Sequence, residues 1–282
     1  MSKPPPLPDR GPSPDSAVTS AGLHWSPLSL ASTSKGVRAH ERVIAQIEQQ
    51  IFTGRLGPGD RLPTQRELAE LLGVGRPAVR EALRILEYLG VVGSQTGRGH
   101  SSGSVLVVRP APALTRSLRL HMAMSQFERD DLLETRLHLE VLAVAKAAEK
   151  AAPEDLDSLA QLVAAMEDPA HTPEQFYAFD TQFHVGLATA SGNRLIGSLM
   201  EAIRDVVQHE MSAAPIDLQS WPRTAGWLGA EHSQILDATR RGDSDRAAEL
   251  LAEHIGRFYD VSFEESPARL ISSWSAAGQT CR

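Results

Sequence analysis

The chain has 282 residues, of which 41% are hydrophobic, enough for two modest cores at roughly 100–200 residues per domain. It has no run of about 18 apolar residues and no signal-peptide core, so we expect a soluble, cytoplasmic protein. The single cysteine, Cys281, excludes an intrachain disulfide and a cysteine-based zinc site. The net charge of −7 alone would argue against DNA binding, but residues 37–108 hold nine arginines against seven acidic residues, whereas residues 109–282 hold 16 basic and 26 acidic residues.

The first 36 residues are rich in proline and serine. This composition is typical of a disordered tail, so we expect residues 1–36 to join neither core. We likewise expect residues 271–282 to form a flexible C-terminal tail. Between the tails, we expect a DNA-binding domain over residues 37–109 and a helical domain over residues 110–270.

The DNA-binding domain is predicted to begin with three helices. Apolar residues at helical spacing predict the first, which ends near Gly54. Thr64 followed by Glu67 is a capping-box pattern, so a second helix should begin near Gln65. The second helix should end near Gly73, since glycine suits the left-handed residue that closes a helix. A third helix is predicted over residues 77–89, with proline in its first turn.

The third helix has an apolar face and a basic face. The apolar residues recur at helical spacing: Ala78, Val79, Ala82, Leu83, Ile85, Leu86 and Leu89. Arg76, Arg80 and Arg84 recur every fourth residue on the other side, where they could meet phosphates and base edges in a major groove. Such a row can also be a plain solvated surface. The capping box and the tight turn in front of it favour the DNA-reading interpretation.

Two short strands are predicted after this helix, over residues 91–95 and 104–108, around a loop rich in glycine and serine. Two strands in this place form the wing of a winged helix. Glycines in the loop permit close backbone approach to a ligand, and Arg98 could enter a minor groove.

Residues 41–108 resemble the N-terminal winged helix of the GntR family of bacterial transcription regulators. The similarity lies in the run from Ile51 to Ala69 and in the run from Gly73 to Leu83, with the spacing intact. The resemblance implies contacts with operator DNA, which we assign to Thr64, Arg66, Arg76, Arg80, Gly97 and Arg98, with Gly97 at the tip of the wing. One residue departs from the pattern. Gly75 stands where the family usually has serine or threonine, so a hydroxyl contact to phosphate should be absent.

The second domain is predicted to be an all-α bundle of six or seven helices, which makes the whole chain mainly α. Proline residues mark two of the helix starts, and Asp243 with Ser244 marks the last. The predicted helices cover residues 114–125, 130–151, 154–167, 174–190, 194–212, 224–241 and 244–263.

Three histidines and one aspartate lie on apolar stripes of these helices. Asp180 and His184 are one turn apart among large apolar side chains, and His232 and His254 keep helical spacing with apolar neighbours. A single histidine on such a face is usually a hydrogen-bonded core residue. A buried carboxylate, however, needs a cation or several donors, and one cation could satisfy all four groups.

This half of the chain is similar to the FadR-like branch of the GntR family, whose helical domain carries a metal site with the pattern D-x-x-x-H, then His, then His. The resemblance implies that Asp180, His184, His232 and His254 bind a divalent metal ion. Three imidazoles and one carboxylate suit Zn²⁺ best, with Ni²⁺, Fe²⁺ or Mn²⁺ as alternatives. Coordination positions would remain open for water or a small anion.

Three further residues are candidates for the effector site. Arg136 and Glu140 point inward from one helix face, and they could simply pair with each other. The resemblance implies instead that Arg136 grips the carboxylate of an effector. Asn193 could line the same cavity or could cap the next helix.

These features predict a ligand-responsive repressor rather than an enzyme. We expect it to bind a short palindrome as a homodimer and to be released by a small organic acid bound beside the metal. One alternative is a metal-dependent hydrolase with a DNA-binding module. Glu231 and Glu253, the nearest candidate bases, should point about 100° away from the metal face of their helices. Another alternative is a sensor for which the metal itself is the signal.

Overall fold

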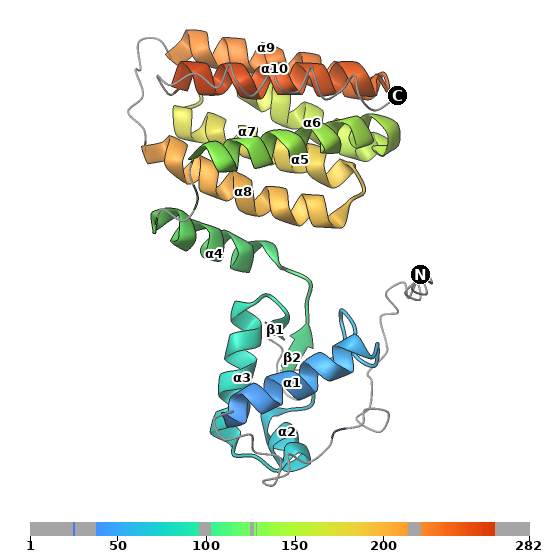
Figure 1. Cartoon of the computed structure of the whole chain (residues 1–282). Coiled ribbons are helices and arrows are strands. Elements are labelled where there is room, and N and C mark those ends of the chain that lie inside the picture. Colours follow the sequence, from blue (N-terminus) through green and yellow to red (C-terminus); the bar gives the residue numbers. More distant parts are fainter. Residues whose placement is uncertain are drawn as a thin grey trace, which may run out of the picture. The chain divides into compact units, whose positions relative to one another are not determined.

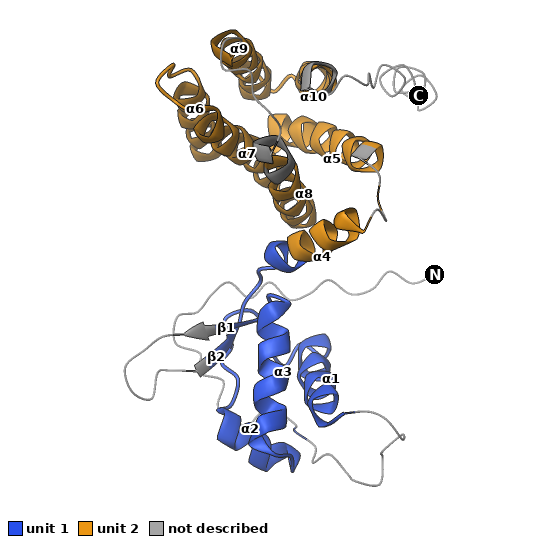
Figure 2. Ribbon diagram, turned by 90° about the vertical axis from the view of Figure 1, so that its left-hand side faces the viewer, with its two compact units in different colours: residues 1–113 blue, residues 114–282 orange. Residues whose placement is uncertain are grey.

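The computed structural model of the chain describes residues 25, 38–95, 103–124, 127, 129–213 and 221–262. It divides into two compact units, residues 1–113 and residues 114–282, which are coloured separately in Figure 2. The predicted fold class is confirmed: the described chain is mainly helical, with one small antiparallel sheet. None of the described helices is both long and apolar enough to cross a membrane.

The first unit is a winged helix, as predicted (Figure 1). Its elements are α1 (Ala39–Phe52), α2 (Gln65–Leu72), α3 (Arg76–Tyr88), β1 (Val92–Gln95) and β2 (Gly103–Leu106). The two strands pair antiparallel, with Val92 opposite Leu106. Arg61 forms a further bridge to Val105, so the chain in front of α2 extends the sheet.

Local sequence signals explain the turn between α2 and α3. Thr64 and Glu67 form the predicted capping box: the backbone N–H of Thr64 donates to the Glu67 carboxylate over 2.8 Å, and the N–H of Glu67 donates to the Thr64 hydroxyl over 3.3 Å. Gly73 ends α2 with a φ of +65°. These contacts fix the direction in which α3 leaves the turn.

The apolar face of α3 is narrower than predicted. Val79, Ala82, Leu83 and Leu86 are buried, but the exposed fraction of Leu89 is 45%. Leu89 is the C-cap of α3, one residue beyond the last helical residue, Tyr88.

The tail prediction is wrong at one residue. Trp25 has an exposed fraction of only 9% and belongs to the core of the first unit, which also contains Val43 and Ile47 of α1. Burial of an indole ring strongly stabilises the folded state. The proline-rich and serine-rich sequence around Trp25 gives no sign of this burial. The other residues of the predicted tails, 1–24, 26–36 and 271–282, lie outside the described residues.

Gly90 follows α3, and its conformation depends on the absence of a side chain. Its φ is +72°, and a Cβ built there would lie 2.0 Å from the carbonyl oxygen of Arg109. Gly73 has a similar φ, but a Cβ there would have no atom within 4 Å. Gly73→Ala should therefore lower the free energy of unfolding by about 1–2 kcal/mol, the cost of the left-handed conformation. Gly90→Ala should cost about 1–3 kcal/mol more, because the backbone must also move.

Urea denaturation of the full-length variants, followed by circular dichroism, measures this difference. Equal losses in the two variants would show that the approach of Arg109 to Gly90 is not a constraint.

The second unit is a helical bundle (Figure 1). Its helices are α4 (Ala111–Ala123, of which the first three residues belong to the first unit), α5 (Arg129–Lys150), α6 (Pro153–Met166), α7 (Pro173–Ala190), α8 (Arg194–Ala213), α9 (Trp221–Arg240) and α10 (Ser244–Ser262). Helix α5 packs against α7, α8, α9 and α10 and so lies at the centre of the bundle. The seven predicted helices are confirmed. Two of them begin three residues earlier than expected, since Pro112 and Pro222 fit in the first turns of α4 and α9.

Candidate metal centre and DNA interface

The predicted DNA-reading residues that the structure describes lie on the surface of the first unit. Arg76, Arg80 and Arg84 are exposed along α3. Arg66 is exposed on α2, 3.9 Å from the Glu70 carboxylate. These guanidinium groups are therefore available to a nucleic acid.

Other residues of the predicted interface contribute differently. Thr64 is exposed, and its hydroxyl caps α2. Gly75 is the N-cap of α3 and makes no side-chain hydrogen bond there, in keeping with the missing hydroxyl. Gly97 and Arg98 lie outside the described residues.

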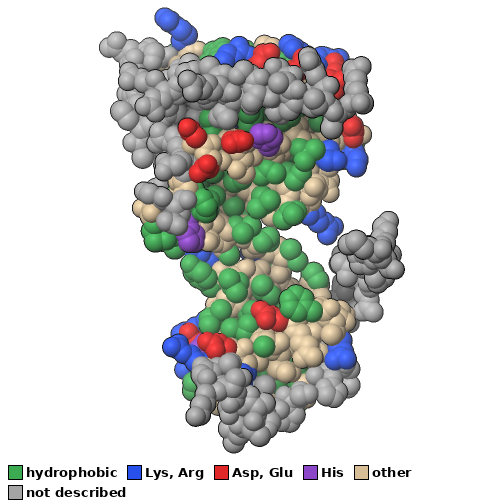
Figure 3. All heavy atoms as spheres, in the orientation of Figure 1, with side chains coloured by type: hydrophobic (Ala, Val, Ile, Leu, Met, Phe, Trp, Pro, Cys, Tyr) green, Lys and Arg blue, Asp and Glu red, His purple; other side chains and the backbone are tan. Residues whose placement is uncertain are grey.

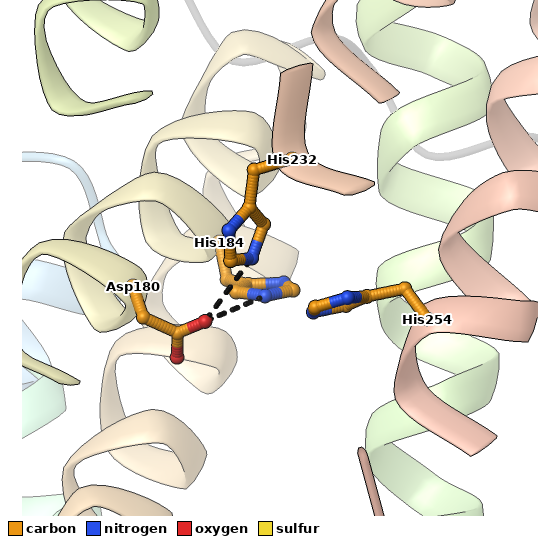
Figure 4. A group of neighbouring side chains, drawn as sticks. All are labelled: Asp180, His184, His232 and His254. Carbon is orange, nitrogen blue, oxygen red and sulfur yellow. Dashed lines mark ion pairs between the residues drawn. The ribbon is translucent and has the colours of Figure 1, made fainter. Parts of the chain in front are cut away.

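The predicted metal ligands meet in the core of the second unit. Asp180 and His184 come from α7, His232 from α9 and His254 from α10, and all four are buried. One candidate ligand atom from each lies within 4.8 Å of the others. Figure 4 shows the three imidazole rings and the carboxylate directed toward a common centre. The apolar stripes predicted these positions because residues three and four apart share one helix face.

The Asp180 carboxylate contacts two of the imidazoles on one side and the buried guanidinium of Arg204 on the other. Its Oδ1 lies 3.1 Å from His232 Nε2 and 3.5 Å from His184 Nε2, as the dashed lines in Figure 4 show. Its Oδ2 accepts a hydrogen bond from the guanidinium of Arg204 on α8. One oxygen of Asp180 thus faces the imidazoles while the other is held by Arg204.

Two glutamates fix the orientation of two of the imidazoles. His184 Nδ1 is bonded to Glu140 of α5, and His254 Nδ1 lies 2.8 Å from Glu231 Oε2. An ionised carboxylate can only accept a hydrogen bond, so Nδ1 is the donor to such a carboxylate in each of these contacts. Paired carboxylates of this kind orient histidines that bind metals.

The predicted pairing of Arg136 with Glu140 is present. Arg136 Nε donates to Glu140 Oε1 over 2.6 Å, and Arg204 lies 3.9 Å from the same oxygen. Glu140 is therefore held by two guanidinium groups and by His184 at once. This arrangement makes Glu140 a residue that positions its neighbours.

The environment changes the pKa of each carboxyl group in the cluster. Burial opposes ionisation, but the guanidinium of Arg204 and the neighbouring His184 outweigh it and hold the pKa of Asp180 well below its usual value. For Glu140 burial also acts upward, yet His184 and Arg136 lower the pKa. Both carboxyl groups are therefore ionised at neutral pH.

Burial lowers the pKa of two of the imidazoles. It is the largest effect on His232, where Asp180 acts in the opposite direction, and on His254, where His232 and His184 lower the pKa further. Burial also raises the pKa of Glu231 against the effect of Arg257. Neutral imidazoles are the form that binds a metal ion.

Sequence reasoning missed Arg204 and misjudged Glu231. Arg204 is buried, with an exposed fraction of 1%, and its only signal was its helical spacing with the apolar Met200 and Val207. Glu231 was expected to point away from the metal face of its helix. It does so, but in that direction it meets His254 on α10.

Asn193 is separate from this cluster. Its side-chain oxygen accepts hydrogen bonds from the backbone N–H groups of Leu195 and Ile196, over 3.1 and 3.3 Å, and its side chain is exposed. It therefore caps α8, the second of the two roles considered from the sequence.

The chain is similar to known bacterial regulators over most of its length. The HTH-type transcriptional regulator LutR of Bacillus subtilis (strain 168) is 31% identical over 220 residues, which are 77% of this chain and 99% of LutR. The chain belongs to the GntR family. Residues 39–101 match the family model "Bacterial regulatory proteins, gntR family", and residues 131–257 match that of the FCD domain. This combination is that of the FadR-like GntR regulators, so the predicted family and subfamily are confirmed.

Two other GntR-family proteins are also similar to this chain over most of its length. The HTH-type transcriptional repressor NanR of Escherichia coli (strain K12) is 29% identical over 245 residues, which are 85% of this chain and 86% of NanR. The solved structure of Streptococcus agalactiae GntR has a TM-score of 0.54 and 25% identity, and the match covers 77% of this chain and 97% of that one. The matching families are regulatory, and none of them is catalytic.

The buried cluster of Asp180, His184, His232 and His254 in this GntR-family protein is suited to bind a metal ion, as FCD domains do. FCD domains are in general metal-binding, and the cluster of this chain lies within the matched region. The Nε2 atoms of His184 and His232 are buried, yet neither makes a hydrogen bond of good geometry with the described residues. A buried nitrogen lone pair without a donor is costly, and a metal ion would satisfy it.

Proposed function

We propose that this GntR-family protein is a repressor that binds a short palindromic operator as a homodimer. A small organic acid, bound beside a metal ion in the helical unit, releases it from the operator. The single observation that carries the proposal is the buried cluster of Asp180, His184, His232 and His254 next to the guanidinium of Arg136. The name of NanR, a repressor, supports the sign of the regulation.

In this proposal, operator contacts come from α3, from the turn in front of it and from the wing. Arg76 and Arg80 are exposed on α3, where they can reach guanine edges or phosphates. The proposed set also includes Thr64, Arg66, Gly97 and Arg98.

The proposed metal is held by one carboxylate oxygen of Asp180 and by three imidazole nitrogens. This donor set suits Zn²⁺ best, with Ni²⁺, Fe²⁺ or Mn²⁺ as alternatives. The ion supplies a positive centre on which an anionic ligand can bind. Arg136 is proposed to hold the ligand carboxylate, while Glu140 holds Arg136 and His184 in place. Asn193 is no longer part of the proposed effector site, since it caps α8.

The proposed homodimer uses the apolar surface of α4. GntR regulators usually act as dimers. Leu114 and Leu120 of α4 and Met124 directly after it are exposed, and hydrophobic side chains gather around this helix in Figure 3. A cavity of about 360 Å³ lies between α4, α5 and α8, lined mainly by apolar residues such as Leu118, Leu132 and Ile203. A second copy of the chain would bury this surface, as soluble proteins rarely leave large apolar patches exposed.

Operator release tests the proposed function. The operator can be selected in vitro from random palindromes, and binding of the full-length protein to it can be followed by fluorescence anisotropy. A small carboxylic acid should weaken binding about 5–150-fold in the metal-loaded protein, the usual range of allosteric coupling, and should have no effect without metal.

Two other outcomes would contradict the proposal. Release that follows the metal concentration without any acid would identify a metal sensor. Turnover of a small ester, amide or lactone would identify a hydrolase.

A further inference from the structure

Helix α4 packs loosely against the rest of the helical unit. Of its described residues only the first, Ala111, is buried, whereas Leu118 and Met122 are partly buried against the core of the unit. Leu114 and Leu120 are exposed. Figure 2 shows α4 beside α5 and α8, and the cavity of about 360 Å³ lies between these three helices.

The size and the walls of this cavity suit a small organic molecule. Most of its lining is apolar and includes Leu118, Met122, Leu132, Leu199 and Ile203. Ligand sites in proteins usually measure about 300–1,000 Å³ and have apolar walls with a few polar groups. A cavity of about 150 Å³ with such walls takes up benzene, so this one has room for a molecule of two fused rings.

The polar side chains of the cavity indicate the charge of its ligand. Ser117, His121, Asp131 and Thr135 line it and are exposed, so they lie at its open side, whereas Leu132 is buried. No lysine or arginine is among the described residues that line the cavity. An anion would lose its hydration there without gaining a cation, and it would lie near the acidic Asp131. The lining therefore favours a neutral molecule with an apolar body and one hydrogen-bonding group.

The cavity is separate from the buried metal cluster, although the same helices hold both. Thr135 and Ile203 line the cavity, and the residues that follow them, Arg136 and Arg204, contact the carboxylates of the cluster. Successive side chains on a helix point about 100° apart, so the two sites lie on different faces of α5 and α8. The described lining residues include none of the four proposed metal ligands. A ligand of the cavity therefore needs no metal ion.

We infer that this cavity is a second ligand site, which takes a neutral, largely apolar molecule of about two fused rings with one hydrogen-bonding group. Such a ligand would join α4 to α5 and α8. Because α4 begins in the first unit, the ligand would contact the helix that connects the two units. Leu120 and Met124, which do not line the cavity, remain available to a second copy of the chain.

Two matched probes test the inference. 1-Naphthol has two fused rings and one hydroxyl group, and 1-naphthalenesulfonate has the same rings with an anionic group instead. Calorimetric titration of the full-length protein should show 1-naphthol binding at least about tenfold more tightly, because the cavity offers the anion no cation. The affinity for 1-naphthol should be the same before and after metal is removed with a chelator.

Variants that fill the cavity should block it. Ala202→Leu places a larger side chain in the cavity from α8 and should abolish binding of 1-naphthol. It should also raise the midpoint of thermal unfolding by about 2–4 °C, as cavity-filling substitutions commonly do. Ser117→Leu fills the cavity from α4 and keeps the test decisive if Ala202→Leu fails to fold. Ala230→Leu, at an exposed alanine of α9, is the matched control and should keep the wild-type affinity.

Equal affinities for the two probes, no binding of 1-naphthol, or binding that disappears with the metal would overturn the inference. If 1-naphthol does not bind and the two cavity-filling variants instead weaken the homodimer in analytical ultracentrifugation, the cavity belongs to a contact with a second copy. The proposed function would survive each of these results, because release by an organic acid depends on the metal centre and not on this cavity.

Discussion

Replacing Arg76 by alanine should weaken operator binding about 5–150-fold, which corresponds to about 1–3 kcal/mol for one bidentate contact with guanine. Arg76 is exposed at the start of α3, the end of the helix that enters a major groove in helix-turn-helix proteins. Fluorescence anisotropy with the selected operator measures the effect at physiological salt. A base contact would also relax the sequence preference at one position, whereas a phosphate contact would lower the salt dependence by about one ion.

The matched control is Arg246→Ala. This arginine is exposed on α10 of the other unit, where it pairs with Glu249. It removes the same charge from the chain and should leave operator binding unchanged. If binding survives Arg76→Ala intact, α3 is not the recognition helix.

His232→Ala should abolish metal binding, whereas the tag-free wild-type protein should hold about one transition-metal ion per chain. His232 is buried at the centre of the cluster, between Asp180 of α7 and His254 of α10. Elemental analysis of protein purified without added metal gives the ion and its stoichiometry. His138→Ala, at an exposed histidine of α5, is the matched control and should keep the ion.

A smaller loss of metal affinity is expected when a residue that hydrogen-bonds to a ligand is replaced. Glu231→Ala frees the Nδ1 of His254 and should lower metal affinity about 10–100-fold, the usual cost of losing a carboxylate that orients a ligand. Glu253→Ala also removes a carboxylate that pairs with Arg257, but it lies outside the cluster and should have no effect. Wild-type protein that holds no metal even after reloading would make the histidine cluster purely structural.

Local signals were sufficient wherever neighbouring residues decide the structure. The capping box of Thr64 and Glu67 fixed the start of α2, and Gly73 fixed its end, because both act through hydrogen bonds and backbone conformation within one turn. The spacing of Asp180 and His184 identified a polar pair on an apolar stripe, and this pair lies in the buried cluster. Each of these predictions needed only one helix.

Features that depend on contacts between distant segments escaped prediction. Arg204 is buried because it contacts the carboxylates of Glu140 on α5 and Asp180 on α7, and the sequence of α8 alone does not reveal these partners. The predicted direction of the Glu231 side chain was correct, but its partner on α10, His254, could not be predicted from the sequence of α9 alone. Trp25 has no periodic neighbours in the sequence, so nothing local indicated that it packs into a core.

Under the proposed function, the order of the cluster residues along the chain would make effector response depend on the synthesis of α10. Glu140, Asp180, Arg204 and His232 emerge from the ribosome before His254, which comes from the last described helix. Until α10 packs, the nascent helical unit holds buried charges and an incomplete ligand set, whereas the winged helix has been complete since residue 106. A product truncated before α10 would therefore keep the winged helix but would lack His254, one of the four proposed metal ligands.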